Sequence, residues 1–183
     1  MNNNTTKQAL LILSELDNDD LNWIAKESRK EHLATHQTLI YKGRRINYLY
    51  LILSGTLSVL LDDKELARLG RGEVVGEISF IDNRPPTATV KAVENSQLLS
   101  ISHLKIKEKL QKDERFASRF YHGLLLCLSD RIRGTIGRLG HGINIDESIR
   151  ELEEPNEVLA ERLELAEAKF NWLANYAGQG LSI

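Results

Sequence analysis

Between residues 35 and 101 the sequence alternates short β-rich runs with glycine or aspartate turn signals, about every eight to twelve residues. Residues 53–69 also predict a hairpin around Asp62 and Asp63. Because this spacing is typical of antiparallel sandwiches and barrels, we predict a mainly β domain. The runs are TLIY, YLYLIL, GTLSVLL, KELARLG, EVVG, TATVKAV and SQLLSI.

Helical patterns flank the β-rich segment on both sides. Residues 8–33 are predicted to be helical, with Asp17 as an N-cap and Asp20 three residues later in a capping-box arrangement. Another helical segment follows the last β run, with Ser102 as its cap. We therefore expect an N-terminal helix, the β domain, a long helix at 116–139 and a C-terminal helix.

The long helix predicted at 116–139 has most of its apolar residues close to one face. It also contains Gly123, Gly134 and Gly137, each of which costs an isolated helix up to about 1 kcal/mol. Small residues on a helix often mark the close approach of another helix, so we expect an intersubunit contact, and a homodimer, through this helix. Packing of the face on its own domain is the alternative. The face comprises Phe116, Phe120, Leu124, Leu128, Ile132, Ile136 and Leu139.

The C-terminal segment predicts one further helix, which opens with Pro155 and a glutamate-rich first half. Its apolar positions follow an a/d spacing over about three heptads. This apolar seam either packs on the β domain or forms a docking site for a protein partner at 155–177. We expect three parts: a flexible tail at 1–13, a domain at 14–139 and an acidic helical extension at 140–183. The a/d positions are Leu159, Leu163, Ala166, Phe170, Leu173 and Ala177.

Composition restricts the classes of function. The 183 residues include one cysteine, Cys127, which excludes an internal disulfide and suits a reducing cytoplasm. No apolar run is long enough to span a membrane, and the five histidines form no ligand-spaced pair for a metal. No nucleophile–base pair or carboxylate dyad is present, so we do not expect an enzyme. Residues 140–183 carry nine acidic and three basic side chains, which disfavours nucleic acid as a partner.

The order of the elements and three stretches resemble the cyclic-nucleotide-binding fold, which catabolite-activator-type bacterial regulators share with cyclic-nucleotide-regulated kinases and channels. The stretches are IYKGRRINYLYLILSGTLSV, LGRGEVVGEISF and TATVKAVENSQLLSI. The first stretch matches the family's pattern of a glycine, a short polar turn and Leu-Tyr-x-Ile-x-x-Gly. The second matches its Leu-x-x-Gly-x-x-x-Gly-Glu-Ile pattern. The third matches its Ala-Thr-Val-x-Ala pattern, which a strand follows. The resemblance covers about residues 14–139 and implies a jelly-roll-like antiparallel barrel.

The resemblance implies a site for a cyclic nucleotide. A cyclic phosphate on a ribose requires backbone N–H donors, a cationic partner and an acceptor for the free 2′-hydroxyl. Glu77 is expected to accept from the hydroxyl, Ile78 and Ser79 to supply N–H groups, and Thr87 to donate its own hydroxyl. The expected ligand-binding residues are Gly76, Glu77, Ile78, Ser79, Arg84, Thr87 and Ala88.

The sequence departs from the family at the phosphate-binding arginine. In the register set by Gly76-Glu77 and Ala88-Thr89-Val90, Pro86 stands in its place and Arg84 lies two residues earlier. Proline offers neither a charge nor an N–H donor, and leaving a buried phosphate unpaired costs more than ~3 kcal/mol. Arg84 is then either a surface residue, facing solvent or Asp82, or a substitute phosphate clamp.

These features favour a non-enzymatic regulatory or signalling protein that senses a nucleotide and relays the change through its long helix and C-terminal helix. The alternative is a degenerate barrel that binds no ligand and acts as a dimeric adaptor between proteins. A transcription regulator is less favoured, because the acidic residues after Gly140 offer no recognition helix.

Overall fold

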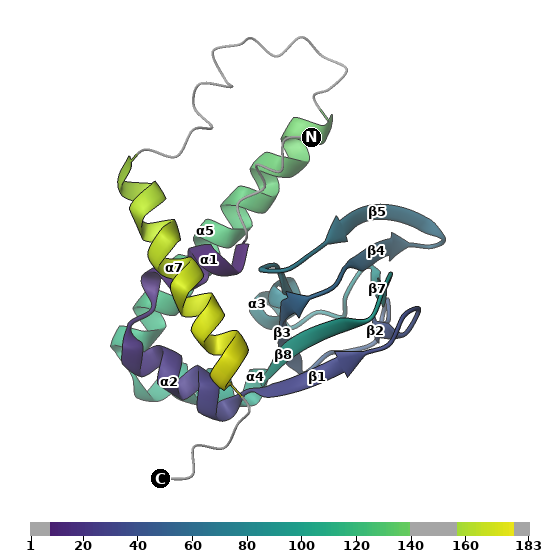
Figure 1. Ribbon diagram of the computed structural model, residues 1–183. Helices are drawn as coiled ribbons and strands as arrows, with labels where there is room; N and C mark the ends of the chain where they lie inside the picture. Colours follow the sequence, from purple (N-terminus) through teal and green to yellow (C-terminus); the bar gives the residue numbers. More distant parts are fainter. Residues whose placement is uncertain (1–7, 140–156, 178–183) are drawn as a thin grey trace.

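The computed structural model describes residues 8–139 and 157–177 (Figure 1). The helices are α1 (Gln8–Glu15), α2 (Asn18–Glu27), α3 (Glu77–Asp82), α4 (His103–Lys112), α5 (Glu114–Leu139) and α7 (Glu157–Tyr176). The strands are β1 (Arg29–Leu33), β2 (Thr38–Ile40), β3 (Tyr48–Ser54), β4 (Leu57–Leu61), β5 (Lys64–Leu69), β6 (Val74–Val75), β7 (Thr89–Ala92) and β8 (Ser96–Ser102). Pro155, expected to open the C-terminal helix, lies outside the described residues.

The strands form two antiparallel four-stranded sheets, ordered β1-β8-β3-β6 and β2-β7-β4-β5. This confirms the predicted jelly-roll-like fold, although within the described residues the strands stay in two sheets and do not close into one barrel. The predicted hairpin is also confirmed, because Leu61 pairs with Lys64 across a turn in which Asp62 has a φ of +47°.

Strand β3 explains why YLYLIL is apolar at every position. Side chains alternate between the two faces of a strand. Tyr50 and Ile52 lie in the core between the sheets, whereas Leu49 and Leu53 lie in the core that the helices cover. Both faces of β3 are therefore covered, and a continuous apolar run is what such a strand requires.

The N-terminal prediction was wrong in two respects. The helix expected over 8–33 is three elements, because the Asp17–Asp20 capping box starts a new helix and Arg29–Leu33 pairs with β8 as a strand. Residues 8–13, expected in a flexible tail, belong to α1, and Ala9–Leu13 are buried. An apolar helix is buried here because α5 and α7 both pack on it.

The buried face of α5 follows a different phase from the predicted one. Phe116, Phe120 and Leu124 are buried as predicted, but Cys127 continues the face and Ile132 is 61% exposed. Eleven residues make just over three whole turns of an α-helix, so position 127 returns close to the azimuth of 116. Predicted Leu128 is half-buried, and the side chains of Ile136 and Leu139 lie outside the described residues.

Gly123 does mark a close helix approach, as the sequence suggested, but within one chain. A Cβ at Gly123 would lie 2.7 Å from the Cα of Ile12 in α1. At Gly123 the close approach is thus made by α1 of the same chain, and the intersubunit contact predicted for the helix at 116–139 stays a prediction.

Helix α7 packs its a/d positions on the N-terminal helices. Ala166, Phe170, Leu173 and Ala177 are fully buried in the core that also contains α1 and α5. The guanidinium of Arg71 lies 4.3 Å from the centre of the Phe170 ring and forms an ion pair with Glu167. From half-buried Leu163 to Ala177 the apolar seam is thus filled by this chain itself, whereas the side chain of Leu159 lies outside the described residues.

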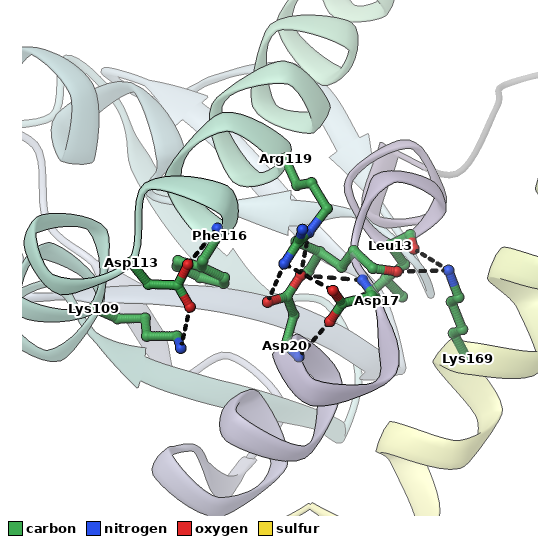
Figure 2. Close-up of polar contacts among 9 residues, drawn as sticks. Leu13, Asp17, Asp20, Lys109, Asp113, Phe116, Arg119 and Lys169 are labelled. Atoms are coloured by element: carbon green, nitrogen blue, oxygen red, sulfur yellow. Dashed lines mark hydrogen bonds and ion pairs between the residues drawn. The ribbon is translucent and has the colours of Figure 1, made fainter.

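Polar contacts at the α1–α2 turn join α2, α5 and α7 (Figure 2). Arg119 of α5 donates from Nε and Nη2 to the carboxylate of Asp20, which is 1% exposed, and also pairs with Asp17. Lys169 of α7 donates to the main-chain oxygens of Leu13 and Leu16, where α1 ends. Burial lowers the pKa of Lys169. The two bonds from Lys169 satisfy main-chain carbonyls that the end of α1 would otherwise leave unpaired.

Candidate functional site

Gly76, between β6 and α3, is required by both its conformation and its surroundings. Its φ is +96°, in the left-handed region that favours glycine. A Cβ there would lie 2.9 Å from the main-chain oxygen of Tyr48 and 3.0 Å from Cδ1 of Ile46. The first bond of α3 runs from the Phe80 N–H to the Gly76 oxygen, so the amides before Phe80 have no partner within the helix.

Glu77 is buried at the start of α3 and faces the long helix. Only 2% of Glu77 is exposed, and its carboxylate forms an ion pair and hydrogen bond with Nη1 of Arg131 in α5. Nη2 of Arg131 donates to the main-chain oxygen of Val74 at 2.8 Å. One guanidinium therefore ties both the last strand before the site and the first residue of α3 to α5.

The other predicted residues of α3 face opposite environments. Ser79 is buried, whereas the side chain of Ile78 is 56% exposed. Phe80 anchors the helix in the core, edge-on to the His103 ring at 5.1 Å. Burial lowers the pKa of His103 to about 4, with a smaller contribution from Lys107, so this ring is neutral near pH 7. The short helix thus rests on buried aromatic rings.

The segment after α3 is exposed. The Arg84 side chain is 82% exposed, and its Nε lies 3.3 Å from Oδ2 of Asp82. The Arg84 N–H also donates to Oδ1 of Asp82 at 2.9 Å. Thr87 is exposed and Ala88 half-buried. Arg84 therefore occupies the surface position that was one of its two predicted alternatives.

The β2–β3 loop holds the proline segment in place. The Gly43 N–H donates to the Pro86 oxygen at 2.8 Å, and the Lys42 N–H donates to Oγ1 of Thr89 at 3.2 Å. Pro86 is half-buried. At the position of the family's arginine the chain thus offers a ring and a carbonyl that is already bonded.

Residues 30–113, which include α3 and its flanking strands, match the family model of the cyclic nucleotide-binding domain. This segment belongs to the cyclic nucleotide-binding domain family. The crystal structure of a cyclic nucleotide-binding domain from Methylobacillus flagellatus has the same fold, with a TM-score of 0.66 at 20% identity, over 77% of this chain and 85% of that one.

Curated relatives extend the match to larger proteins. The potassium voltage-gated channel protein eag of Drosophila melanogaster is 31% identical over 112 residues, which are 60% of this chain and 10% of the relative. The cAMP-activated global transcriptional regulator CRP of Salmonella typhimurium is 28% identical over 97 residues, 50% of this chain and 46% of the relative. The chain thus spans less than half the length of these relatives, with which it shares a regulatory-type domain.

The structure of the cyclic nucleotide-binding domain brings Gly76, Glu77, Ile78 and Ser79 together at one helix start, while the exposed Arg84 pairs with Asp82. Their roles toward a ligand stay predictions. Sequence reasoning missed Arg131, although a signal existed: it follows Cys127 by four residues and so continues the buried face of α5.

Two expectations, one about Cys127 and one about membrane-spanning helices, can be compared with the structure. Cys127 is fully buried, and burial raises the pKa of its thiol to about 12, which fits a structural thiol rather than a nucleophile. Among the described residues, no helix combines the length and apolar character needed to cross a bilayer.

Proposed function

We propose that this protein is a non-enzymatic cytoplasmic regulatory module that binds a cyclic nucleotide beside Gly76–Ser79 and relays occupancy through α5. The ion pair between Glu77 and Arg131 carries the proposal, because it joins the predicted ribose-binding carboxylate directly to the long helix. A ligand hydroxyl that donates to Glu77 competes with, or adds to, the bonds of Arg131. Either outcome changes the contacts that hold α5.

Relay of this kind requires two conformations of the protein that differ in the position of α5, and a ligand that binds one of them more tightly than the other. Arg131 also bonds the Val74 oxygen, so its release from Glu77 would remove a charged partner while this bond to a neutral acceptor remains. The ligand signal is therefore expected in the segment of α5 around Arg131, while the Phe116–Leu124 segment stays packed on α1.

Calorimetry with cyclic mono- and dinucleotides tests binding, and hydrogen exchange of α5 amides tests relay. We expect saturable binding that Glu77→Ala weakens, together with altered exchange near Arg131. Arg131→Lys keeps a charge but loses the two-pronged geometry, so it should retain binding while reducing the exchange response. Absence of binding by the folded wild-type protein to every nucleotide in the panel contradicts the proposal.

A second candidate is a degenerate domain that acts as an adaptor, which the exposed Arg84 and the proline at position 86 favour. Pro86→Arg separates the two: saturable cyclic-nucleotide binding that appears only in this variant supports the degenerate domain.

Because the inner seam of α7 is filled, a partner at 155–177 would contact its outer surface, where Leu165 is 59% exposed. Leu165→Glu should then abolish partner capture without unfolding the chain.

We also propose a homodimer through the outer face of α5. Tyr121, Leu125 and Ile132 are exposed, and with half-buried Leu128 they follow a 4-3-4 spacing that suits pairing with a second copy of the same stripe. Leu125→Glu should convert a dimer to a monomer in light scattering. Leu66→Glu, the same change at a half-exposed leucine of β5, should leave the dimer intact.

A further inference from the structure

The β2–β3 loop crosses from one end of the candidate site to the other. Near its start, the Gly43 N–H donates to the Pro86 oxygen at 2.8 Å. Near its end, Cδ1 of Ile46 would lie 3.0 Å from a Cβ at Gly76. Three residues span at most about 11 Å of extended chain. The two residues between these contacts, both arginines, therefore stand at the mouth of the site.

These two residues, Arg44 and Arg45, have no carboxylate partner among the described residues. Both side chains are exposed. The Arg44 guanidinium lies 4.9 Å from the centre of the Tyr41 ring, and the Arg45 side chain forms no hydrogen bond or ion pair with any residue that the structure describes. The neighbouring Lys42, in contrast, pairs with Asp62 at 2.7 Å. Two guanidiniums are thus available to an anion that comes from solution.

A phosphate at this site needs a cation, and Pro86 supplies none. A guanidinium presents a planar fork of N–H donors that fits two phosphate oxygens, and such charge-assisted bonds are stronger than neutral ones. The Arg45 side chain has no bond to break, so turning toward a phosphate costs it only rotamer entropy. An arginine outside the stretch from Gly76 to Pro86 can therefore supply the charge that the proline lacks.

We propose that Arg45, with Arg44 beside it, binds the phosphate of the nucleotide from the β2–β3 loop. This inference rests on the proposed function, because it names the cation of that same site. The arrangement places the phosphate at the exposed mouth, whereas the space between the sheets behind it is filled by apolar side chains such as Val75. Because the pair forms near solvent, salt should weaken it.

Calorimetry of the full chain with cyclic AMP and cyclic GMP, at low and at high sodium chloride, tests the role of Arg45. Arg45→Gln should weaken binding about tenfold, the effect of one hydrogen bond to a charged group, and should flatten the dependence of affinity on salt. Arg45→Lys should recover part of the affinity, because it restores the charge without the planar fork. Arg115→Gln, at an exposed arginine of α5, is the matched control and should change neither quantity.

The outcomes separate this inference from the proposed function. If the wild-type protein binds a nucleotide, and the double variant Arg44→Gln/Arg45→Gln binds it as tightly and with the same salt dependence, the loop is not the phosphate partner and the proposed function stands. If the wild-type protein binds neither nucleotide, the inference fails as well. Both side chains are exposed, so the midpoint of urea unfolding should not move. A loss of affinity that follows a fall in this midpoint would assign the effect to folding and would also overturn the proposal.

Discussion

The two ends of the stretch from Gly76 to Pro86 are built differently. At the first end, Glu77 and Phe80 are buried, and a glycine is favoured by a φ of +96° and by the Tyr48 oxygen, which would lie 2.9 Å from a Cβ. At the second end, Arg84 is 82% exposed and bonds mainly to its own neighbour, Asp82. The first end is held by packing and by an ion pair to a distant helix, and the second by the β2–β3 loop.

This difference shows which positions of a binding loop can be substituted without disrupting the fold. A residue that fills the core is constrained by many neighbours at once, whereas a position nearer the surface, such as half-buried Pro86, can change at less cost to the fold. Likeness at the first end therefore indicates the architecture of the domain, and the residue at position 86 bears on the phosphate of the proposed ligand.

The largest effect is expected for Arg131→Met, which removes the cation beside a carboxylate that is 2% exposed. An uncompensated buried charge is costly, so the free energy of unfolding should fall by about 4 kcal/mol in urea denaturation. Arg133→Met, an exposed arginine of the same helix, should cost below about 0.5 kcal/mol. Equal losses for the two variants would contradict the central role given to the ion pair.

Gly76→Ala should destabilise the domain by about 3 kcal/mol. The substitution combines a left-handed φ of +96° with a Cβ placed 2.9 Å from the Tyr48 oxygen. Gly70→Ala is the control, because its added Cβ would meet nothing within 4 Å. Guanidinium unfolding of both variants measures the difference. A Gly76→Ala protein as stable as Gly70→Ala would mean that the first end is less constrained than its contacts indicate.

His103 should make the buried end sensitive to acid. Its pKa is about 4 when folded and about 6.5 when unfolded, so below pH 6.5 the unfolded state binds the extra proton. Stability is fully present above pH 6.5 and should fall by about 2 kcal/mol on going to pH 5, with the loss ending near pH 4. His103→Gln should remove this slope in denaturation curves measured at each pH. An unchanged slope would assign the acid sensitivity to other groups.

Most of the fold was predictable because its signals are local. Seven strands, the hairpin at Asp62 and the capping box at Asp17 each follow from adjacent residues. Strand β1 was missed because RKEHL is polar, and only its pairing with β8 makes it a strand. An edge strand with exposed side chains carries no periodic apolar signal.

The candidate site was predictable only in part. Gly76 and Glu77 stand in a recognisable motif, whereas Arg131 lies 54 residues from its partner and is found only once the phase of α5 is known. The apolar residues of α5 fit two neighbouring faces, and the sequence alone favoured the one containing Ile132. Contacts with α1 at Gly123 decide between them, and such contacts depend on the tertiary fold.

The smallest effect is expected for Arg84→Ala at the exposed end. Its pairing with Asp82 is solvent-exposed, and surface pairs of this kind contribute between about 0 and 1 kcal/mol, so the midpoint of urea unfolding should hardly move. If Arg84 nevertheless serves as a phosphate clamp, the same variant must lose nucleotide affinity in calorimetry while its stability is unchanged. Arg84→Lys would then recover part of that affinity, because lysine keeps the charge but not the planar fork. Unchanged affinity in Arg84→Ala would leave the second end without a phosphate partner and favour the adaptor.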